Sequence, residues 1–183
     1  RTHGIQKNKK LFLNKDMAFD EKKSVNAWYY EMSHLGYNYR ITDLQAALGN
    51  SQLSKLDKFV KKRIEIAKIY DKGFSKNKFI TAPRVKTYVK HAYHLYTILI
   101  NFKKLKKSRN EVMQKLRQIK IGTQVLYIPV YSQPYYKKKY NYNKKFFKNS
   151  ENYYNSCLSI PIFYSMKKEE INYVVEKINN LIN

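Results

Sequence analysis

The sequence predicts a fold of mixed helix and sheet, in which most of the chain forms a two-layer α+β domain. Two short, apolar and β-rich runs, at 94–101 and 125–128, alternate with segments that have the three-and-four spacing of amphipathic helices. Strand, helix and strand in that order are typical of a sheet with helices packed on it. Hydrophobic residues make up 43% of the 183 residues, which is enough to form the core of such a domain.

The first 40 residues give few regular signals. Residues 1–27 are predicted to form a helix end and then a polar connection, and the charge-rich stretch 16–24 is expected to be an exposed loop. Trp28–Met32 is short and aromatic, which favours an extended segment. The chain begins at Arg1, and we expect it to be the C-terminal part of a longer protein.

A turn followed by a helix start is predicted at 36–45. Gly36 can adopt a backbone conformation closed to other residues, and Thr42 with Gln45 has the capping-box pattern that begins a helix. The turn presents Asn38 and Arg40 just ahead of that helix. An amide donor, a guanidinium and free helix N–H groups together suit a phosphate. From spacing alone, a structural Asn and a solvated Arg in an ordinary loop is the favoured interpretation.

Two helices are predicted next, at 41–50 and 51–74, the second ending near Gly73 and followed by Pro83. The second helix has one apolar face with lysines opposite. Its apolar positions are Leu53, Leu56, Phe59, Val60, Ile64, Ala67 and Tyr70.

The remaining residues are predicted to build the domain. Strands are expected at 94–101, 125–128 and 159–162, and helices at 108–119, 151–158 and 167–182. The signals for the helix at 108–119 are a capping box of Ser108 with Glu111 and a stop at Gly122. The residues expected in the core are Ile98, Leu116, Val125 and Val174, with Tyr153, Tyr154 and Cys157 packing from the helix at 151–158. The lysine-rich runs 103–107 and 137–145 are interpreted as exposed linkers.

The chain is strongly basic, with 37 Lys and Arg against 13 Asp and Glu and a net charge of +24. Anionic metabolites, membrane surfaces and nucleic acids are all compatible with this charge. Lysine dominates over arginine and is abundant together with Asn, Tyr and Ile, which indicates codon bias rather than a dedicated phosphate-binding stripe. The stretch 135–147 could stack bases while its lysines hold phosphates. A basic nucleic-acid-binding module is therefore the alternative from another functional class, although no known nucleic-acid motif accompanies it.

Other kinds of site have little support in the sequence. The single cysteine, Cys157, excludes an internal disulfide and a cysteine-rich metal site, and we expect it to be a small core residue. The four histidines have no metal-binding spacing, so no metal site is predicted. The five glycines form no phosphate-cradling loop, and no apolar run approaches the roughly 20 residues that span a bilayer.

Several motifs resemble, in chain order, those of the nucleotide-sugar aminotransferases of the DegT/DnrJ/StrS type. The run G-Y-N-Y-R-I-T-D-L-Q-A-A-L-G at 36–49 carries the resemblance most clearly. Further similar segments are Arg1–Ile5, Gln52–Leu56, Lys62–Tyr70, His94–Tyr96, Gly122–Val125, Gln133–Tyr136 and Leu158–Pro161. Within the family, the W-Y-Y-E-M and L-G-Y-N-Y-R segments are most similar to the branch that acts in pseudaminic acid biosynthesis.

The resemblance implies a pyridoxal-phosphate-dependent transferase of fold type I, an α/β fold of which this chain forms the C-terminal part. It implies three regions: 1–50 at the end of the large cofactor-binding domain with a dimer-interface loop, 51–80 as a long connecting helix, and 81–183 as the small α+β domain. The expected assembly is a cytoplasmic homodimer with shared active sites. No specific nucleic acid and no membrane are expected as partners.

The implied reaction moves an amino group from an amino acid, glutamate, to a UDP-linked 4-keto-6-deoxy sugar. The lysine that links the cofactor precedes Arg1 in the family, so no catalytic residue is assigned and the chain alone is expected to be inactive. A histidine in place of that lysine would instead indicate a sugar dehydratase of the same fold, which is the nearest alternative.

The resemblance also implies roles for residues in this chain. Asn38 matches the residue that hydrogen-bonds the cofactor phosphate of the opposite subunit, and Arg40 is expected to steady that loop or to contact an anionic ligand. Residues in the family's nucleotide-sugar region are His94 and Tyr96, and the aromatic residues that suit a sugar or uracil face are Tyr127 and Tyr131. For these four residues, simple structural packing is the alternative.

The sequence departs from the resembled transaminases at two points. Leu126 stands where they have a histidine after the valine of a V-H-Y segment. Ile162, Phe163 and Tyr164 follow the S-x-P motif, where they have another histidine. Both departures concern the sugar side of the implied site and leave the phosphate loop unchanged.

Overall fold

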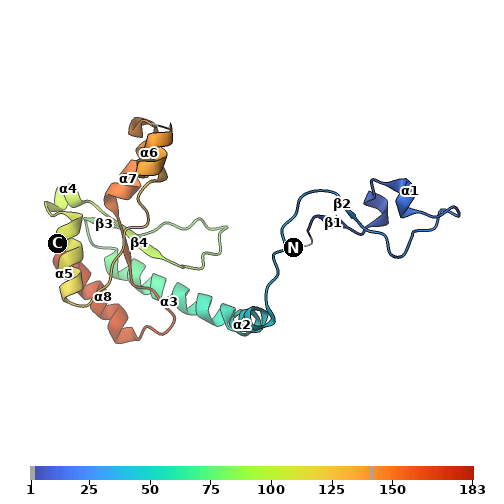
Figure 1. Cartoon of the computed structure of the whole chain (residues 1–183). Helices are drawn as coiled ribbons and strands as arrows, with labels where there is room; N and C mark the ends of the chain where they lie inside the picture. Colours follow the sequence, from blue (N-terminus) through green and yellow to red (C-terminus); the bar gives the residue numbers. More distant parts are fainter. Residues whose placement is uncertain (1–2, 141) are drawn as a thin grey trace. The chain divides into compact units, whose positions relative to one another are not determined.

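The computed structural model describes residues 3–140 and 142–183, and the chain divides into two compact units (Figure 1). The N-terminal unit comprises residues 1–54 and the C-terminal unit residues 55–183.

The N-terminal unit is built around a small antiparallel sheet. Strand β1 (Ile5–Gln6) pairs with β2 (Glu31–Met32), with the short helix α1 (Lys15–Ala18) between them in sequence and α2 (Asp43–Leu53) at the end. The predictions of a helix end and of a loop at 16–24 are therefore wrong in part. Four-residue helices such as α1 are too short to produce a readable period, and Asn14 caps α1 by accepting a hydrogen bond from the Met17 N–H at 3.2 Å.

Glu31, in the aromatic segment 28–32, links two parts of this unit through hydrogen bonds. Its carboxylate accepts hydrogen bonds from the backbone N–H groups of Leu13 at 2.6 Å and Asn14 at 3.1 Å, and from the Tyr29 hydroxyl at 2.7 Å. The bonds from Leu13 and Tyr29 lower the pKa of Glu31, because they favour its charged form. One carboxylate therefore joins the turn before α1 to strand β2.

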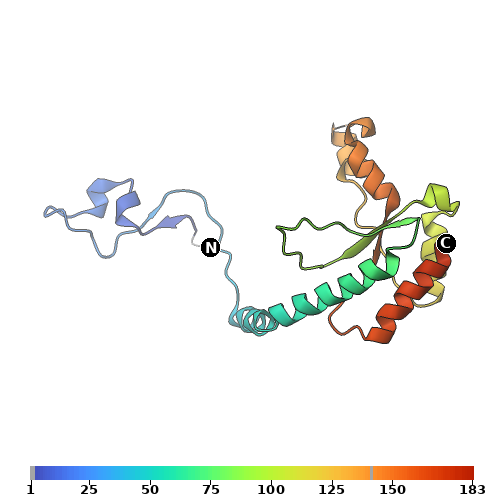
Figure 2. The same ribbon diagram turned by 180° about the vertical axis from the view of Figure 1, so that it is seen from behind.

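The C-terminal unit is a three-stranded antiparallel sheet with helices packed on it. Strands β3 (Ile80–Thr81), β4 (Tyr96–Ile100) and β5 (Cys157–Ile160) lie in the order β3-β4-β5, and Ile98 faces Leu158 in the register. The α-helices of this unit are α3 (Leu56–Phe74), α4 (Phe102–Leu105), α5 (Arg109–Gln118), α6 (Pro134–Tyr140), α7 (Lys148–Ser156) and α8 (Lys168–Leu181). The chain between β3 and β4 extends away from the sheet before it returns at His94 (Figure 2).

The core lies between the sheet and three helices. Alternate residues of β4, namely Tyr96, Ile98 and Ile100, are buried and join one cluster with apolar residues of α3, α5 and α8 (Figure 1). The members contributed by the three helices are Ile66, Ala67, Tyr70, Phe74, Val112, Leu116, Ile171, Val174 and Ile178. The predicted α+β architecture, the buried Cys157 and the core positions Ile98, Leu116 and Val174 are confirmed.

The long helix ends at Phe74 as predicted but differs from its prediction at its start and in the role of Gly73. The expected helix at 51–74 is divided between α2 and α3, and Leu53 and Leu56 near the division are exposed. Gly73 does not end the helix. A Cβ atom on Gly73 would lie 2.5 Å from Val175 Cγ1, so this glycine permits the close approach of α3 to α8.

Three further expectations in the C-terminal unit are wrong. The segment 125–128 forms no strand, because only Gln124 pairs with Ser159, through two backbone hydrogen bonds of 3.1 and 2.8 Å; Val125 is half-buried. The lysine-rich runs 103–107 and 137–145 are not simple linkers, because part of the first lies in α4 and part of the second in α6. Tyr153, which was expected to pack in the core, is exposed. In each case tertiary contacts or short helices override a local pattern that had no clear period.

The ends of α5 follow the prediction only in part. The Ser108 hydroxyl accepts from the Glu111 N–H at 3.1 Å, whereas the Glu111 carboxylate binds Lys115 instead of completing a capping box. The chain leaves the helix at Lys120, whose φ of 63° is left-handed, rather than at Gly122.

Candidate functional site

The loop that is predicted to bind a phosphate is anchored by two glycines whose backbones touch. A Cβ atom on Gly36 would lie 2.2 Å from the Gly4 backbone nitrogen, and one on Gly4 would lie 1.8 Å from the His34 carbonyl oxygen. The Ser33 N–H also donates to the Gly4 carbonyl at 3.0 Å. Gly4 has a φ of 76°, whereas Gly36 is not left-handed, so the predicted reason for Gly36 is wrong. Gly36 is needed for space rather than for its backbone conformation.

Asn38 and Arg40 are brought together on this loop. The Arg40 Nε donates to the Asn38 Oδ1 at 3.1 Å, and both residues are exposed. Because its oxygen already accepts this bond, the Asn38 amide has its N–H₂ group available as a donor. The two flanking tyrosines, Tyr37 and Tyr39, stack with ring centroids 5.0 Å apart, which stiffens the loop between them.

The predicted capping box at the start of α2 is confirmed. The Thr42 hydroxyl accepts from the Gln45 N–H at 3.3 Å, and the Gln45 side chain accepts from the Thr42 N–H at 3.0 Å. This box occupies two of the backbone donors at the helix start. Anion binding here therefore depends mainly on the loop before the helix.

Large apolar side chains around this loop are exposed, as the sequence predicted for an interface. Leu35 is 92% exposed and Leu44 is 81% exposed, which is far from the usual state of leucine. Other exposed members are Trp28, Tyr30, Met32, Tyr37, Tyr39, Ile41 and Leu48. Many exposed large apolar side chains in one short segment are typical of an interaction site.

A second candidate feature is a pocket of about 500 Å³ in the C-terminal unit, here called the sheet-edge pocket. The predicted residue His94 lines it, together with polar groups of Thr123, Gln124 and Ser159. Its other lining residues are Leu95, Lys120, Gly122, Leu126, Ile160, Pro161, Ile162 and Phe163. A few polar groups opposite an apolar wall are typical of a small-molecule site.

Two of these lining residues escaped the sequence-based selection. Thr123 and Gln124 lie in the G-T-Q-V segment that resembles the family, and this resemblance is the signal that could have identified them. Among the residues at which the sequence departs from the resembled transaminases, Leu126, Ile162 and Phe163 line the pocket, whereas Tyr164 does not.

The structure places Tyr96 in the core rather than in the lining of the sheet-edge pocket, although the resemblance puts this residue in the nucleotide-sugar region. Its side chain is fully buried, its ring lies 5.0 Å from that of Tyr70, and its hydroxyl donates to Asp71 at 2.6 Å. Burial and the bond to Asp71 raise the pKa of Tyr96, so the hydroxyl stays protonated. Tyr96 faces the core because residues alternate along β4.

Replacing Tyr96 with Phe tests this placement. We expect Tyr96→Phe to lower the free energy of unfolding by about 1–2 kcal/mol, since it removes the hydrogen bond to Asp71 but keeps the ring. Ligand binding should be unchanged. Denaturant unfolding of the full-length protein measures the first effect and calorimetric titration with a UDP-sugar measures the second. A loss of affinity at unchanged stability would restore Tyr96 to the site.

The other two predicted tyrosines do not line the sheet-edge pocket. Tyr127 is 73% exposed and follows Leu126 in the chain. The Tyr131 ring stacks on Phe147 with centroids 4.2 Å apart, and its hydroxyl donates to Glu151 at 2.8 Å. Desolvation and the Glu151 bond raise the pKa of Tyr131 to about 12.

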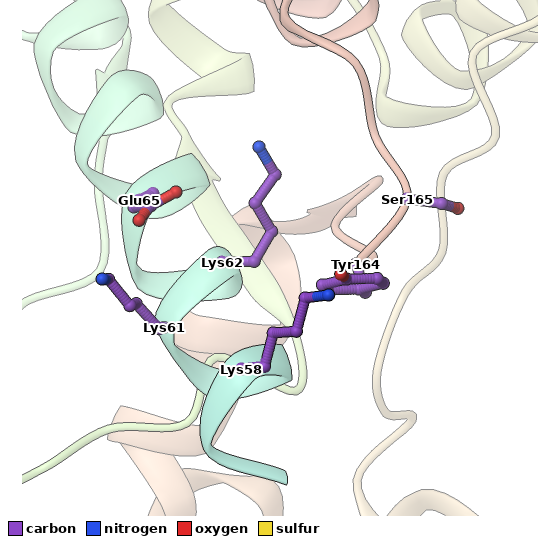
Figure 3. A pocket seen from close by; sticks show the side chains of 6 residues that line it. All are labelled: Lys58, Lys61, Lys62, Glu65, Tyr164 and Ser165. Carbon is purple, nitrogen blue, oxygen red and sulfur yellow. The ribbon is translucent and has the colours of Figure 1, made fainter. Parts of the chain in front are cut away.

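A basic hollow of about 450 Å³ lies between α3 and the segment after β5 (Figure 3). Lys58 extends beside the Tyr164 ring, and its bond with the Tyr164 hydroxyl raises the pKa of Lys58. Lys61, Lys62, Glu65 and Ser165 complete the lining. In the part of the chain that the structure describes, ion pairs form only at Lys115–Glu111 and Lys177–Glu176. Lys58, Lys61 and Lys62 are not in such pairs, so the hollow has an excess of positive charge.

Residues 3–140 and 142–183 contain neither a cluster of metal-binding side chains nor a helix that could span a membrane. Within these ranges no group of three or more His, Cys, Asp or Glu side chains is placed to hold a metal ion. None of the helices described there has the length and apolar character needed to cross a membrane.

Comparison with known proteins identifies relatives of the whole chain. Residues 1–179 match the DegT/DnrJ/EryC1/StrS aminotransferase family. The chain is 37% identical over 166 residues to the spore coat polysaccharide biosynthesis protein SpsC of Bacillus subtilis, covering 90% of this chain and 43% of SpsC. It is 38% identical over 155 residues to the UDP-4-amino-4,6-dideoxy-N-acetyl-beta-L-altrosamine transaminase of Campylobacter jejuni, covering 85% and 40%.

A solved structure gives the same relationship in three dimensions. Helicobacter pylori PseC, an aminotransferase of pseudaminic acid biosynthesis, matches with a TM-score of 0.78 and 26% identity over 100% of this chain and 44% of PseC. A putative sugar aminotransferase of Streptococcus pneumoniae, solved with bound cofactor, matches with a TM-score of 0.75 at 22% identity, which supports the fold. The chain thus spans less than half the length of these relatives. The predicted fold type I is confirmed, and the chain belongs to the DegT/DnrJ/EryC1/StrS aminotransferase family.

Proposed function

We propose that the full-length protein is a pyridoxal-phosphate-dependent aminotransferase that moves an amino group from glutamate to a UDP-linked 4-keto-6-deoxy sugar. The observation that carries this proposal is the arrangement of Gly4, Gly36, Asn38 and Arg40 in a chain that matches the family from end to end. The loop offers a neutral amide donor held by a guanidinium, which is the chemistry that a phosphate requires.

The residues present fit the phosphate end of the cofactor. When bound, pyridoxal phosphate supplies the electron sink that lets an amino group leave one carbon skeleton and join another. This chain would hold the phosphate of the cofactor. The Asn38 N–H₂ would donate a hydrogen bond to it, and Arg40 fixes the orientation of the Asn38 amide and adds positive charge. The residue that distinguishes transamination from dehydration lies outside this chain.

The apolar wall of the sheet-edge pocket supports a deoxy sugar as substrate. Leu126, Ile162 and Phe163 line this wall, and they complement a C6 methyl group better than a hydroxymethyl group. Thr123, Gln124 and His94 supply hydrogen-bonding groups for sugar hydroxyls or the nucleotide. We propose a pathway to a surface amino sugar such as pseudaminic acid. Two UDP-4-amino-4,6-dideoxy-N-acetyl-beta-L-altrosamine transaminases are 37–38% identical to this chain, and PseC, an aminotransferase of pseudaminic acid biosynthesis, is 26% identical.

A homodimer with shared sites accounts for the exposed apolar surface of the N-terminal unit. In this proposal residues 1–50 form the last part of the large cofactor-binding domain, and residues 81–183 form the small domain. Residues 51–80 form the long helix that connects the two domains. The loop Leu35–Arg40 and the aromatics Trp28–Met32 then lie at the subunit interface, where chain outside 1–183 covers them.

The proposed activity can be tested on the purified full-length protein. We expect it to take up pyridoxal phosphate with a visible absorbance band, and glutamate to convert the cofactor to its amino form and bleach that band. With a UDP-linked 4-keto-6-deoxy sugar, mass spectrometry should then show a product with one additional nitrogen. A protein that never takes up the cofactor would contradict the proposal, and glutamate-independent loss of a sugar hydroxyl would identify the dehydratase instead.

A further inference from the structure

One arginine outside the predicted site residues joins two segments that are far apart in the sequence. Arg63 is half-buried on α3, and its Nη1 donates to the backbone carbonyls of Tyr93 at 3.0 Å, His94 at 3.2 Å and Ile162 at 2.9 Å. Tyr93 and His94 precede β4, whereas Ile162 follows β5. A single guanidinium therefore bridges the entry to one strand and the exit from its neighbour.

Both bridged segments line the sheet-edge pocket. The first contributes His94 and Leu95, and the second contributes Pro161, Ile162 and Phe163. Strands β4 and β5 pair up to Tyr96 and Ile160, so the ladder does not hold the residues beyond them. The separation of these two pocket segments is thus fixed by side-chain contacts, and Arg63 is the contact that reaches both.

The segment before β4 needs an external restraint. Tyr93 has a φ of 47°, in the left-handed region that a bulky residue rarely adopts. Such strain persists only where the surroundings hold it, and the Tyr93 carbonyl is held by Arg63. If the guanidinium were lost, the turn could relax and carry the adjacent His94 with it.

The segment after β5 has additional supports on α3. The Tyr70 hydroxyl donates to the Pro161 carbonyl at 2.7 Å, and the Tyr164 ring lies 4.5 Å from that of Phe59, with Lys58 beside it (Figure 3). Tyr93 is supported too, since its N–H donates to His91 Nδ1 at 3.0 Å and its ring packs against the core. The His91 bond lies within the same turn, however, so the side after β5 should tolerate the loss of Arg63 better than the Tyr93–His94 side. The expected displacement is localised rather than global.

From these contacts we infer that Arg63 is a positioning residue for the nucleotide sugar, holding the two segments of the sheet-edge pocket at a fixed spacing. The identity of the ligand rests on the proposed function, but the positioning does not. The three carbonyls surround one nitrogen, Nη1, and share its two N–H groups. A lysine has enough donors, but it carries them on a flexible stem and its ammonium is more strongly hydrated, so it should replace Arg63 only in part.

The chain offers a matched control in Arg109. Its Nη1 also donates to two carbonyls, those of Tyr154 and Cys157, at the opposite end of β5 and outside the pocket lining. Loss of Arg109 removes a comparable arginine–backbone contact without touching the pocket. General destabilisation and local mispositioning can therefore be separated.

The experiment compares Arg63→Met, Arg63→Lys and Arg109→Met in the cofactor-loaded full-length protein. Hydrogen exchange is followed by mass spectrometry, and affinity is measured by calorimetry with UDP-N-acetylglucosamine as a stable probe. We expect Arg63→Met to accelerate exchange at 93–95 and, to a smaller extent, at 162–164, and to weaken probe binding about tenfold or more. Arg63→Lys should fall between Arg63→Met and the wild type, and Arg109→Met should bind like the wild type.

Unchanged exchange at both segments in Arg63→Met overturns the inference, as does an equal loss of affinity in Arg63→Met and Arg109→Met. If Arg63→Met does not fold, Arg63→Lys is judged by the same two readouts. A wild-type protein that fails to bind the probe contradicts the proposed substrate class. The exchange comparison then decides by itself whether Arg63 positions the two segments.

Discussion

Asn38→Ala in the full-length protein should weaken retention of pyridoxal phosphate by about 1.5–3 kcal/mol, a decrease of roughly 10- to 150-fold in affinity. The physical reason is the loss of the N–H₂ donor, whose orientation is set by the 3.1 Å bond from Arg40 to the amide oxygen. Asn38→Asp has nearly the same shape and should be more severe, because it places a carboxylate against the phosphate. Cofactor absorbance after gel filtration and titration of the apoprotein measure both effects.

The control for this prediction is Asn110→Ala, an exposed asparagine on α5. It should retain the cofactor like the wild type. The C-terminal unit should remain folded in both Asn38 variants, since its core is built from residues such as Ile98, Leu116 and Val174, and in Asn110→Ala because that side chain is exposed. Normal cofactor affinity in Asn38→Asp would exclude Asn38 from the phosphate site.

Mixed dimers test whether Asn38 serves the neighbouring subunit. Subunits carrying Asn38→Ala are combined with subunits that lack the cofactor-linking lysine. If Asn38 acts across the interface, some heterodimers contain one intact site, and part of the activity should return. A mixture no more active than either parent, with heterodimers confirmed by mass spectrometry, would show that Asn38 does not act in trans.

The parts of the fold that could be predicted are those with strong local signals. The period of α8, the β-rich run of β4 and the Thr42–Gln45 capping box all identified real elements, because each pattern is written in consecutive residues. The segment 125–128 looks like a strand by the same criteria, yet it forms none, and the isolated bridge lies just before it, at Gln124. Pairing depends on a partner edge, which a local pattern does not contain.

The site was predictable to the extent that it is a motif. Asn38 and Arg40 could be selected from their sequence neighbourhood, and they do bond to each other. Tyr96 was chosen for its place beside His94, but alternation along β4 turns its side chain into the core. Arg63 could not be selected at all, because its role depends on carbonyls 30 and 99 residues away in the chain.

Gly36→Ala should strongly destabilise the N-terminal unit, although it adds only one methyl group. The added Cβ would lie 2.2 Å from the Gly4 nitrogen and 2.8 Å from the Gly4 Cα, and backbone atoms cannot swing aside as a flexible side chain can. Overpacking of this kind costs about 1–3 kcal/mol. The contact lies two residues before Asn38, so the loop should shift and the cofactor should be lost at least as readily as in Asn38→Ala.

Gly49→Ala is the matched control, because it adds the same methyl group within α2, where no described atom lies within 4 Å. Alanine is favoured over glycine inside a helix by about 0.5–1 kcal/mol, so this variant should be neutral or slightly stabilising. Gly36→Ala should therefore lower both the thermal unfolding temperature and the cofactor absorbance of the full-length protein. Gly49→Ala should leave the absorbance unchanged and the unfolding temperature unchanged or slightly higher. Equal behaviour of Gly36→Ala and Gly49→Ala would show that the Gly4–Gly36 contact does not shape the phosphate loop.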